Sequence, residues 1–327
     1  MQQDWGKILK MLSEKKNIKT IISRYGIYII FLVIFLVLSI ANQAFFTPSN
    51  LLNILKQAST VAVIAIGQTL CLITGGMDLS SGSIMALAGV TSAMFGLADK
   101  TNMPAAFLTA ILVGMLCGFI NGLIVSKGRV PAFIATLGMQ QAARGMALLV
   151  TNATPVFGLS AAYIFMGSGK VLGIPMLVII MVAVVIVTAF ILNKTKFGRH
   201  VYAVGGNEQS AHVSGIRVQR VKLIVYTAAG ALAGLGGIML AGRIQSGTPT
   251  MGEGYELDAI AGAVIGGVST SGGVGTIYGA VIGSLLMAMI SNGLDLMNVS
   301  AYYQQIIKGI IIVLAVLLDV QTKSSKK

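Results

Sequence analysis

The segment Ile174–Asn193, with the sequence IPMLVIIMVAVVIVTAFILN, contains twenty residues and no charged side chain. A helix rises about 1.5 Å per residue, so about 20 apolar residues match the roughly 30 Å hydrocarbon core of a bilayer. This segment is therefore predicted to form a helix that crosses a membrane.

The rest of the chain has the same character. Apolar residues make up 55% of the 327 residues, charged residues make up only 10%, and the mean hydropathy is +0.86. A soluble domain carries about 25% charged residues, so most of this chain is expected to lie in lipid. The 40 glycines follow no Gly-X-Y period and accompany only 6 prolines, which excludes collagen. The composition predicts an all-α polytopic membrane protein.

The same length criterion predicts about ten transmembrane helices. The apolar runs lie near 25–45, 58–75, 82–97, 105–126, 131–150, 174–193, 223–241, 255–270, 275–293 and 302–320. Glycine-rich polar stretches interrupt the regions 58–97 and 255–293, where the number of crossings is open. We expect an N-terminal segment over 1–24, one transmembrane domain over 25–320, and a basic tail over 321–327.

The positive charges predict the orientation. The net charge is +13, from 23 Lys and Arg residues against 10 Asp and Glu. If both termini lie in the cytoplasm, ten crossings place 17 of the 23 cations on the cytoplasmic side, four on the opposite side and two within spans. Cations accumulate in the cytoplasmic loops of membrane proteins. We therefore expect cytoplasmic termini, and we attribute the charge to membrane orientation and not to nucleic-acid binding.

Two glycine-rich segments interrupt the apolar runs near 75–83 and 266–275, at corresponding distances from the two chain ends. Such interruptions in two halves of a transporter point to a translocation site. The ten-crossing count gives both segments the same orientation, whereas an inverted repeat requires opposite orientations. Either the repeat is not inverted or one of the segments is re-entrant.

The long loop 193–222 is predicted to carry a short surface helix. Asn207 can cap the first turn through its side chain, and the acidic Glu208 favours the positive end of the helix dipole. Gly215 can end the helix in the left-handed conformation. A capped helix bounded by glycines suits docking to a separate cytoplasmic protein, although an ordinary loop helix would have the same spacing.

This loop resembles the glutamate-alanine-alanine-glycine coupling motif of bacterial ABC importer permeases, in the version found in ribose-type sugar permeases. Further segments that resemble that family are Gly76–Ser83, Gly128–Leu137, Gly254–Ala261, Ser271–Gly275, Asn292–Leu294 and Tyr302–Gln304. Gln209 and Ser210 depart from the family's alanine pair. The resemblance implies that the loop contacts an ATPase through Gly205, Gly206, Asn207, Glu208, Ala211, Ser214 and Gly215.

The resemblance also implies the partners of the chain. Two copies would form the pathway as a homodimer in a bacterial plasma (inner) membrane, surrounded by membrane lipid. Cytoplasmic ABC ATPase subunits would bind the ATP, so this chain would hold no cofactor, and an extracytoplasmic sugar-binding protein would deliver the substrate. Ribose or another pentose is favoured as the monosaccharide, with a galactoside, xylose, inositol or a furanose signalling sugar as alternatives.

A neutral sugar requires a path lined by hydroxyls, amides and aromatic faces. The candidates for that path are Asp78, Ser80, Asn121, Gln140, Asn292, Tyr302, Tyr303 and Gln304. Each of them could instead make an interhelical hydrogen bond, and Asp78 could cap a helix. Close helix packing is the interpretation of the glycines Gly114, Gly118, Gly122, Gly262 and Gly266.

The sequence predicts neither an enzyme nor a metal site. Gly167–Lys170 resembles part of a phosphate loop, but the complete pattern is missing and Val171 stands where the hydroxyl residue is needed. An intramembrane enzyme would need a catalytic constellation that the spacing does not offer. The alternative function is a self-contained, ion-coupled secondary transporter, which would need a buried acidic relay beginning at Asp78.

Overall fold

The computed structural model describes residues 27–324, and within this range the regular structure is helical apart from one two-stranded hairpin. The predicted N-terminal segment 1–24 lies outside the described residues. The helices are Ile27–Ala41, α2 (Pro48–Ile73), α3 (Ser81–Ala93), α4 (Met103–Ser126), α5 (Ala132–Val150), α6 (Ala161–Ser168), α7 (Met176–Lys194), α8 (Lys196–Gly206), α9 (Glu208–Val213), α10 (Val218–Ile244), α11 (Tyr255–Ile265), α12 (Ile277–Leu296) and α13 (Ala301–Ser324).

The helix lengths bear directly on the membrane prediction. Among the described residues, α2, α4, α7, α10 and α12 are long and apolar enough to cross a bilayer. Each of the predicted apolar runs overlaps a helix, but α3 and α11 contain only 13 and 11 residues. They are about 20 Å and 16 Å long, well short of a roughly 30 Å core. The all-α architecture is confirmed, while the number of ten crossings stays a prediction.

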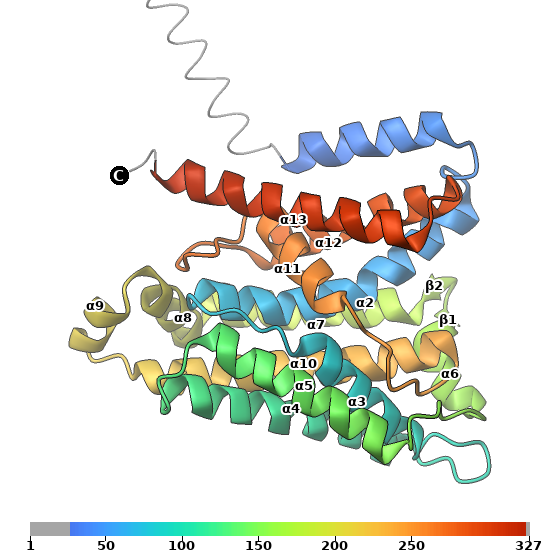
Figure 1. The fold of residues 1–327 in the computed structure, drawn as a ribbon, viewed down its shortest axis with the longest axis horizontal. Helices are drawn as coiled ribbons and strands as arrows, with labels where there is room; N and C mark the ends of the chain where they lie inside the picture. Colours follow the sequence, from blue (N-terminus) through green and yellow to red (C-terminus); the bar gives the residue numbers. More distant parts are fainter. Residues whose placement is uncertain (1–26, 325–327) are drawn as a thin grey trace, which may run out of the picture.

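The helices pack side by side into one bundle with two distinct ends (Figure 1). We name them by what they carry: the loop end holds α8 and α9, and the hairpin end holds α6 and the strand pair. The strands β1 (Lys170–Val171) and β2 (Ile174–Pro175) pair antiparallel. The predicted span beginning at Ile174 therefore starts two residues later, because Ile174 and Pro175 belong to this hairpin and Pro175 precedes the first turn of α7.

Glycines bring the central helices into backbone contact, as predicted. A Cβ atom at Gly114 of α4 would overlap the carbonyl oxygen of Gly230 in α10, and one at Gly118 would overlap that of Tyr226. A Cβ atom at Gly266 would likewise overlap the carbonyl oxygen of Gly279 in α12. Small residues at such crossings allow close approach, which drives helix association in lipid.

Non-helical backbone separates two pairs of helices at the loop end. The first break, residues 74–80, lies between α2 and α3, and the second break, residues 266–276, lies between α11 and α12. They correspond to the predicted glycine-rich interruptions 75–83 and 266–275. Their relation to the bilayer, crossing or re-entrant, stays a prediction.

A pair of glycine substitutions tests the packing. Alanine stabilises a helix by about 1 kcal/mol relative to glycine. A Cβ atom at Gly309 would meet no heavy atom within 4 Å, so we expect Gly309→Ala to leave the stability of the protein unchanged or to raise it. Gly114→Ala must separate α4 from α10, and overpacking of this kind costs about 1–3 kcal/mol. Thermal unfolding in detergent should show a lower midpoint for Gly114→Ala alone, and equal midpoints would contradict the packing.

Candidate functional site

The predicted loop helix is present as α9. The side chain of Asn207 accepts a hydrogen bond from the Ser210 backbone N–H at 2.8 Å, and Gly215 follows the helix with a φ of +82°. Ser214 Oγ donates to Ser210 O, and Ala211 is buried. The local capping prediction is thus confirmed, because both helix ends are set by residues within the loop itself.

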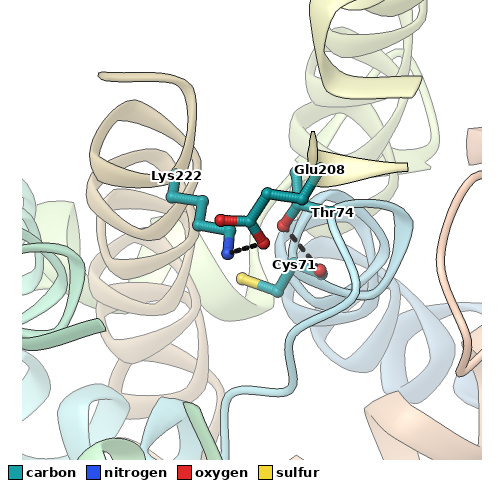
Figure 2. Close-up of polar contacts among 4 residues, drawn as sticks. All are labelled: Cys71, Thr74, Glu208 and Lys222. Atoms are coloured by element: carbon teal, nitrogen blue, oxygen red, sulfur yellow. Dashed lines mark hydrogen bonds and ion pairs between the residues drawn. The ribbon is translucent and has the colours of Figure 1, made fainter. Parts of the chain in front are cut away.

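An ion pair attaches α9 to the long central helix α10. Lys222 Nζ lies 2.6 Å from Glu208 Oε2, and their side chains are 19% and 59% exposed. Figure 2 shows the two side chains pointing toward each other beside the end of α2, where Thr74 Oγ1 donates to Cys71 O. The pair is partly exposed, so it fixes the orientation of α9 more than it stabilises the fold.

The backbone of α8 meets the end of α2 and the second break at one point. Gly273 N donates to Ile73 O at 2.9 Å, which joins the second break to the end of α2. A Cβ at Gly205 would overlap Ile73 O and lie 2.6 Å from Gly273 N, and one at Gly272 would lie 2.7 Å from Gly205 O. We call these four residues, Ile73, Gly205, Gly272 and Gly273, the glycine junction.

Side chains from two other helices form hydrogen bonds with the second break. Tyr202 Oη, one turn before Gly205 on α8, donates to Gly275 O at 2.7 Å. Burial raises the pKa of the Tyr202 phenol, which keeps its proton available for this bond. From α13, Asp319 Oδ2 accepts from Thr270 N at 3.0 Å and from Thr270 Oγ1 at 2.8 Å.

Buried polar groups hold the first break. Asp78 is 1% exposed, and its Oδ1 accepts from the N–H of Ser80 at 2.8 Å and from its hydroxyl at 2.5 Å. Asn121 Nδ2 of α4 donates to Ser80 Oγ at 2.8 Å, and Thr136 Oγ1 of α5 accepts from Leu79 N at 3.1 Å. Three of the predicted path residues, Asp78, Ser80 and Asn121, therefore form one cluster that braces the start of α3.

The fourth predicted path residue of this region, Gln140, bonds the start of α11. Its Nε2 donates to Glu256 Oε1 at 3.2 Å, and Glu256 is buried. One turn along α5, Arg144 Nη1 donates to Pro249 O and Met251 O, in the segment that leads into α11. A Cβ at Gly82 would overlap both Glu256 Oε2 and Gly252 O. The N-terminal ends of the two short helices α3 and α11 therefore lie against each other.

The other predicted path residues lie at the opposite end of the bundle. Asn292 exchanges two hydrogen bonds with Asn50 of α2, at 2.8 and 2.9 Å. Gln304 Nε2 donates to Asp295 Oδ1 at 2.7 Å and closes the turn from α12 to α13. Tyr302 and Tyr303 are 80% and 66% exposed. These contacts give Asn292 and Gln304 a packing role, and a role in the path stays a prediction.

Several residues at the site were not anticipated from the sequence. Tyr202, Thr136 and Asp319 each bind the backbone of a break from a different helix. Asp258 of α11 forms a 2.8 Å ion pair with Lys308 of α13, and their side chains are 14% and 25% exposed. A cation and an anion within two apolar runs were the only sequence signal for this pair.

Substitutions at Asp78 separate its hydrogen bonds from its charge. Asp78→Asn keeps an acceptor for Ser80 and removes a buried negative charge, so we expect an unchanged or higher unfolding midpoint in detergent. Asp78→Ala leaves two donors of Ser80 unpaired, at a cost of about 1–3 kcal/mol. If Asp78→Asn were as destabilised as Asp78→Ala, the bracing role of the acceptor would be wrong.

The chain matches the family described as branched-chain amino acid transport system / permease component over residues 50–316. It is 45% identical to the ribose import permease protein RbsC of Escherichia coli (strain K12) over 292 residues, which are 88% of this chain and 91% of the relative. The corresponding protein of Bacillus subtilis (strain 168) is 42% identical over 314 residues, 95% of this chain and 97% of the relative.

The D-allose transport system permease protein AlsC of Escherichia coli (strain K12) is 37% identical over 310 residues, 94% of this chain and 95% of the relative. No solved structure matches the chain significantly. These relatives are transport permease components and not enzymes, and the matches cover nearly the whole chain. The chain therefore belongs to the branched-chain amino acid transport system / permease component family, as a multi-pass ABC transporter permease similar to the ribose import permeases.

Proposed function

We propose that this chain is the membrane-spanning permease subunit of a bacterial ABC importer that carries a monosaccharide inward, driven by separate cytoplasmic ATPase subunits. The observation that carries the proposal is the glycine junction, through which α8 contacts the end of α2 and the second break. A docked protein that displaced α9 and α8 would thereby displace the ends of α2, α11 and α12 together. The similarity to ribose and D-allose permeases supports the choice of substrate class.

Ribose or another pentose is the favoured substrate. The relatives are named for ribose and D-allose, which are uncharged sugars rich in hydroxyl groups. The polar groups between α3, α4, α5 and α11 include hydroxyl, amide and carboxylate groups, such as Ser80, Asn121 and Gln140. Groups of this kind exchange hydrogen bonds with sugar hydroxyls, so we assign the path to the side of the bundle that α5 borders.

A second copy of the chain would complete that path. Gln141, in the middle of α5, is exposed, and nothing in the described chain lies within 4 Å of a Cβ at Gly138 or Gly145 on the same helix. A polar amide facing lipid is costly, whereas small residues beside it allow another helix to approach closely. These features favour a homodimer in which the α5 helices of the two copies face the sugar.

The charge distribution supports a cytoplasmic loop end. The cations beside the loop end are Lys127, Arg129, Lys194, Lys196, Arg199, Arg217, Arg220 and Lys222. Outside α5 and α13, which contain Arg144 and Lys308, the cations nearer the hairpin end are Lys56, Lys100, Lys170 and Arg243. With this orientation in the bacterial plasma membrane, both termini are cytoplasmic, the ATPases dock on α9, and the sugar-binding protein docks at the hairpin end.

In this mechanism the chain itself hydrolyses nothing. ATP binding closes the ATPase pair and moves α9, which is attached to α10 by the Glu208–Lys222 ion pair. α8 passes the displacement through Gly205 and Tyr202 to the second break and to the end of α2, from which the first break continues. The breaks then reorient the short helices α3 and α11, whose N-terminal ends meet beside the polar cluster, and access alternates between the two sides of the membrane.

Reconstitution tests the energy source. The permease, its ATPase and its binding protein are placed in proteoliposomes, and uptake of radiolabelled ribose is followed with ATP inside. We expect uptake to persist when ionophores collapse the membrane potential and to stop when ATP is replaced by ADP. Uptake by the permease alone, driven by a proton or sodium gradient, would contradict the proposal and favour the secondary transporter.

A further inference from the structure

A cavity of about 860 Å³ opens at the loop end between α9, α10, the first break and the loop from α4 to α5. This volume lies within the range of about 300–1,000 Å³ that is typical of small-molecule sites. The cavity is separate from the polar cluster around Ser80 and Gln140, neither of which lines it. Nothing in the proposed transport cycle requires a cavity of this chemistry.

The rim of the cavity is strongly basic. Four cationic side chains line it, Arg129, Arg217, Arg220 and Lys222, against the single carboxylate Glu208. Glu208 is already paired with Lys222, so the three arginines give the cavity a net charge of +3. Guanidinium groups bind phosphate oxygens through paired, charge-assisted hydrogen bonds.

Two helix N-termini face the cavity, as do the C-terminal ends of α2 and α4. α5 begins at Ala132 and α10 begins at Val218, and both residues line the cavity. In neither helix does a side chain cap the first turn. The exposed N–H groups at the start of a helix, together with its dipole, favour a bound anion.

The floor of the cavity is polar but uncharged. Tyr226 is 1% exposed and Ser126 is 6% exposed, and the hydroxyl groups of both are buried without a hydrogen-bond partner among the described residues. Tyr226 Oη lies against Gly76, where a Cβ atom would overlap it. A buried hydroxyl without a partner is destabilising, and a ligand with hydroxyl groups of its own would supply the missing hydrogen bond.

We propose that this cavity binds a phosphorylated polyol, with the phosphate held by the arginines at the rim and the hydroxyl groups held by Ser126 and Tyr226 at the floor. A free sugar phosphate and a lipid headgroup that joins a phosphate to a polyol share this chemistry. Under the proposed function, on which this interpretation rests, the cavity faces the cytoplasm, where a kinase would convert the imported sugar into its phosphate. A bound sugar phosphate would bridge α9 and α10 and oppose movement of α9, so that the accumulated product restrains import.

Binding to the full-length chain in phosphatidylcholine nanodiscs tests the site without requiring transport. The probes are ribose 5-phosphate, ribose and inorganic phosphate, measured by calorimetry. We expect ribose 5-phosphate to bind at least about tenfold more tightly than either of the others, because only it engages both rim and floor. Equal affinities for ribose 5-phosphate and inorganic phosphate, or no binding at millimolar concentrations, would overturn the proposal.

Matched variants assign the binding to this cavity. Arg220→Gln removes a rim cation and Tyr226→Phe removes only the hydroxyl group, so each is expected to weaken ribose 5-phosphate about tenfold. Arg199→Gln, on α8 and outside the cavity, should bind as the unmodified chain does. Unchanged affinity in both cavity variants, with unchanged thermal stability, would place the ligand elsewhere.

Nanodiscs containing phosphatidylglycerol distinguish the two sources of the ligand. If this lipid competes with ribose 5-phosphate and is lost from Arg220→Gln in native mass spectrometry, the polyol phosphate site is confirmed with lipid as its occupant. If it does not compete, the free sugar phosphate is the occupant. These experiments measure binding alone. ATP-independent uptake in the reconstitution experiment would therefore refute the proposed function without contradicting the binding site.

Discussion

The approach of three backbone segments at the glycine junction is the constraint on which the loop end depends. Ile73 ends α2, Gly205 lies in the last turn of α8, and Gly273 lies in the second break, and the hydrogen bond from Gly273 N to Ile73 O closes the contact. A Cβ at Gly205 has no room in this arrangement. Because backbone atoms cannot move aside as a flexible side chain can, the three segments must move together or separate.

The polar groups buried in the bundle follow from the same architecture. The breaks expose backbone groups that a continuous helix would satisfy internally, and in lipid such groups must find partners within the protein. Thr136, Tyr202 and Asp319 provide them from three other helices. The breaks are thereby held by side chains that can exchange one hydrogen-bond partner for another, which suits segments whose orientation changes during a transport cycle.

Local features of the fold were predictable from the sequence, and long-range features were not. Asn207 and Gly215 act on the helix between them, and Gly114 and Gly118 follow a helical period, so their roles could be read directly. The partners of Tyr202 and Asp319 lie dozens of residues away, and no periodicity reports such pairings. A polar residue in an apolar run has the same sequence signature in a path and in a packing contact. Asn121, Gln140, Asn292 and Gln304 all bond to other helices or breaks in the structure, and the sequence did not predict these partners.

The ratio of sugar transported to ATP hydrolysed is the most direct test of the junction. Gly205→Ala places a methyl group into the junction, whereas a Cβ at the neighbouring Gly206 meets nothing within 4 Å, and both substitutions raise helix propensity equally. In the reconstituted transporter, we expect Gly205→Ala to retain ATP hydrolysis but to lower the ratio several-fold, and Gly206→Ala to keep the ratio of the unmodified protein. The same ratio in Gly205→Ala, Gly206→Ala and the unmodified transporter would show that the junction does not couple the loop end to the breaks.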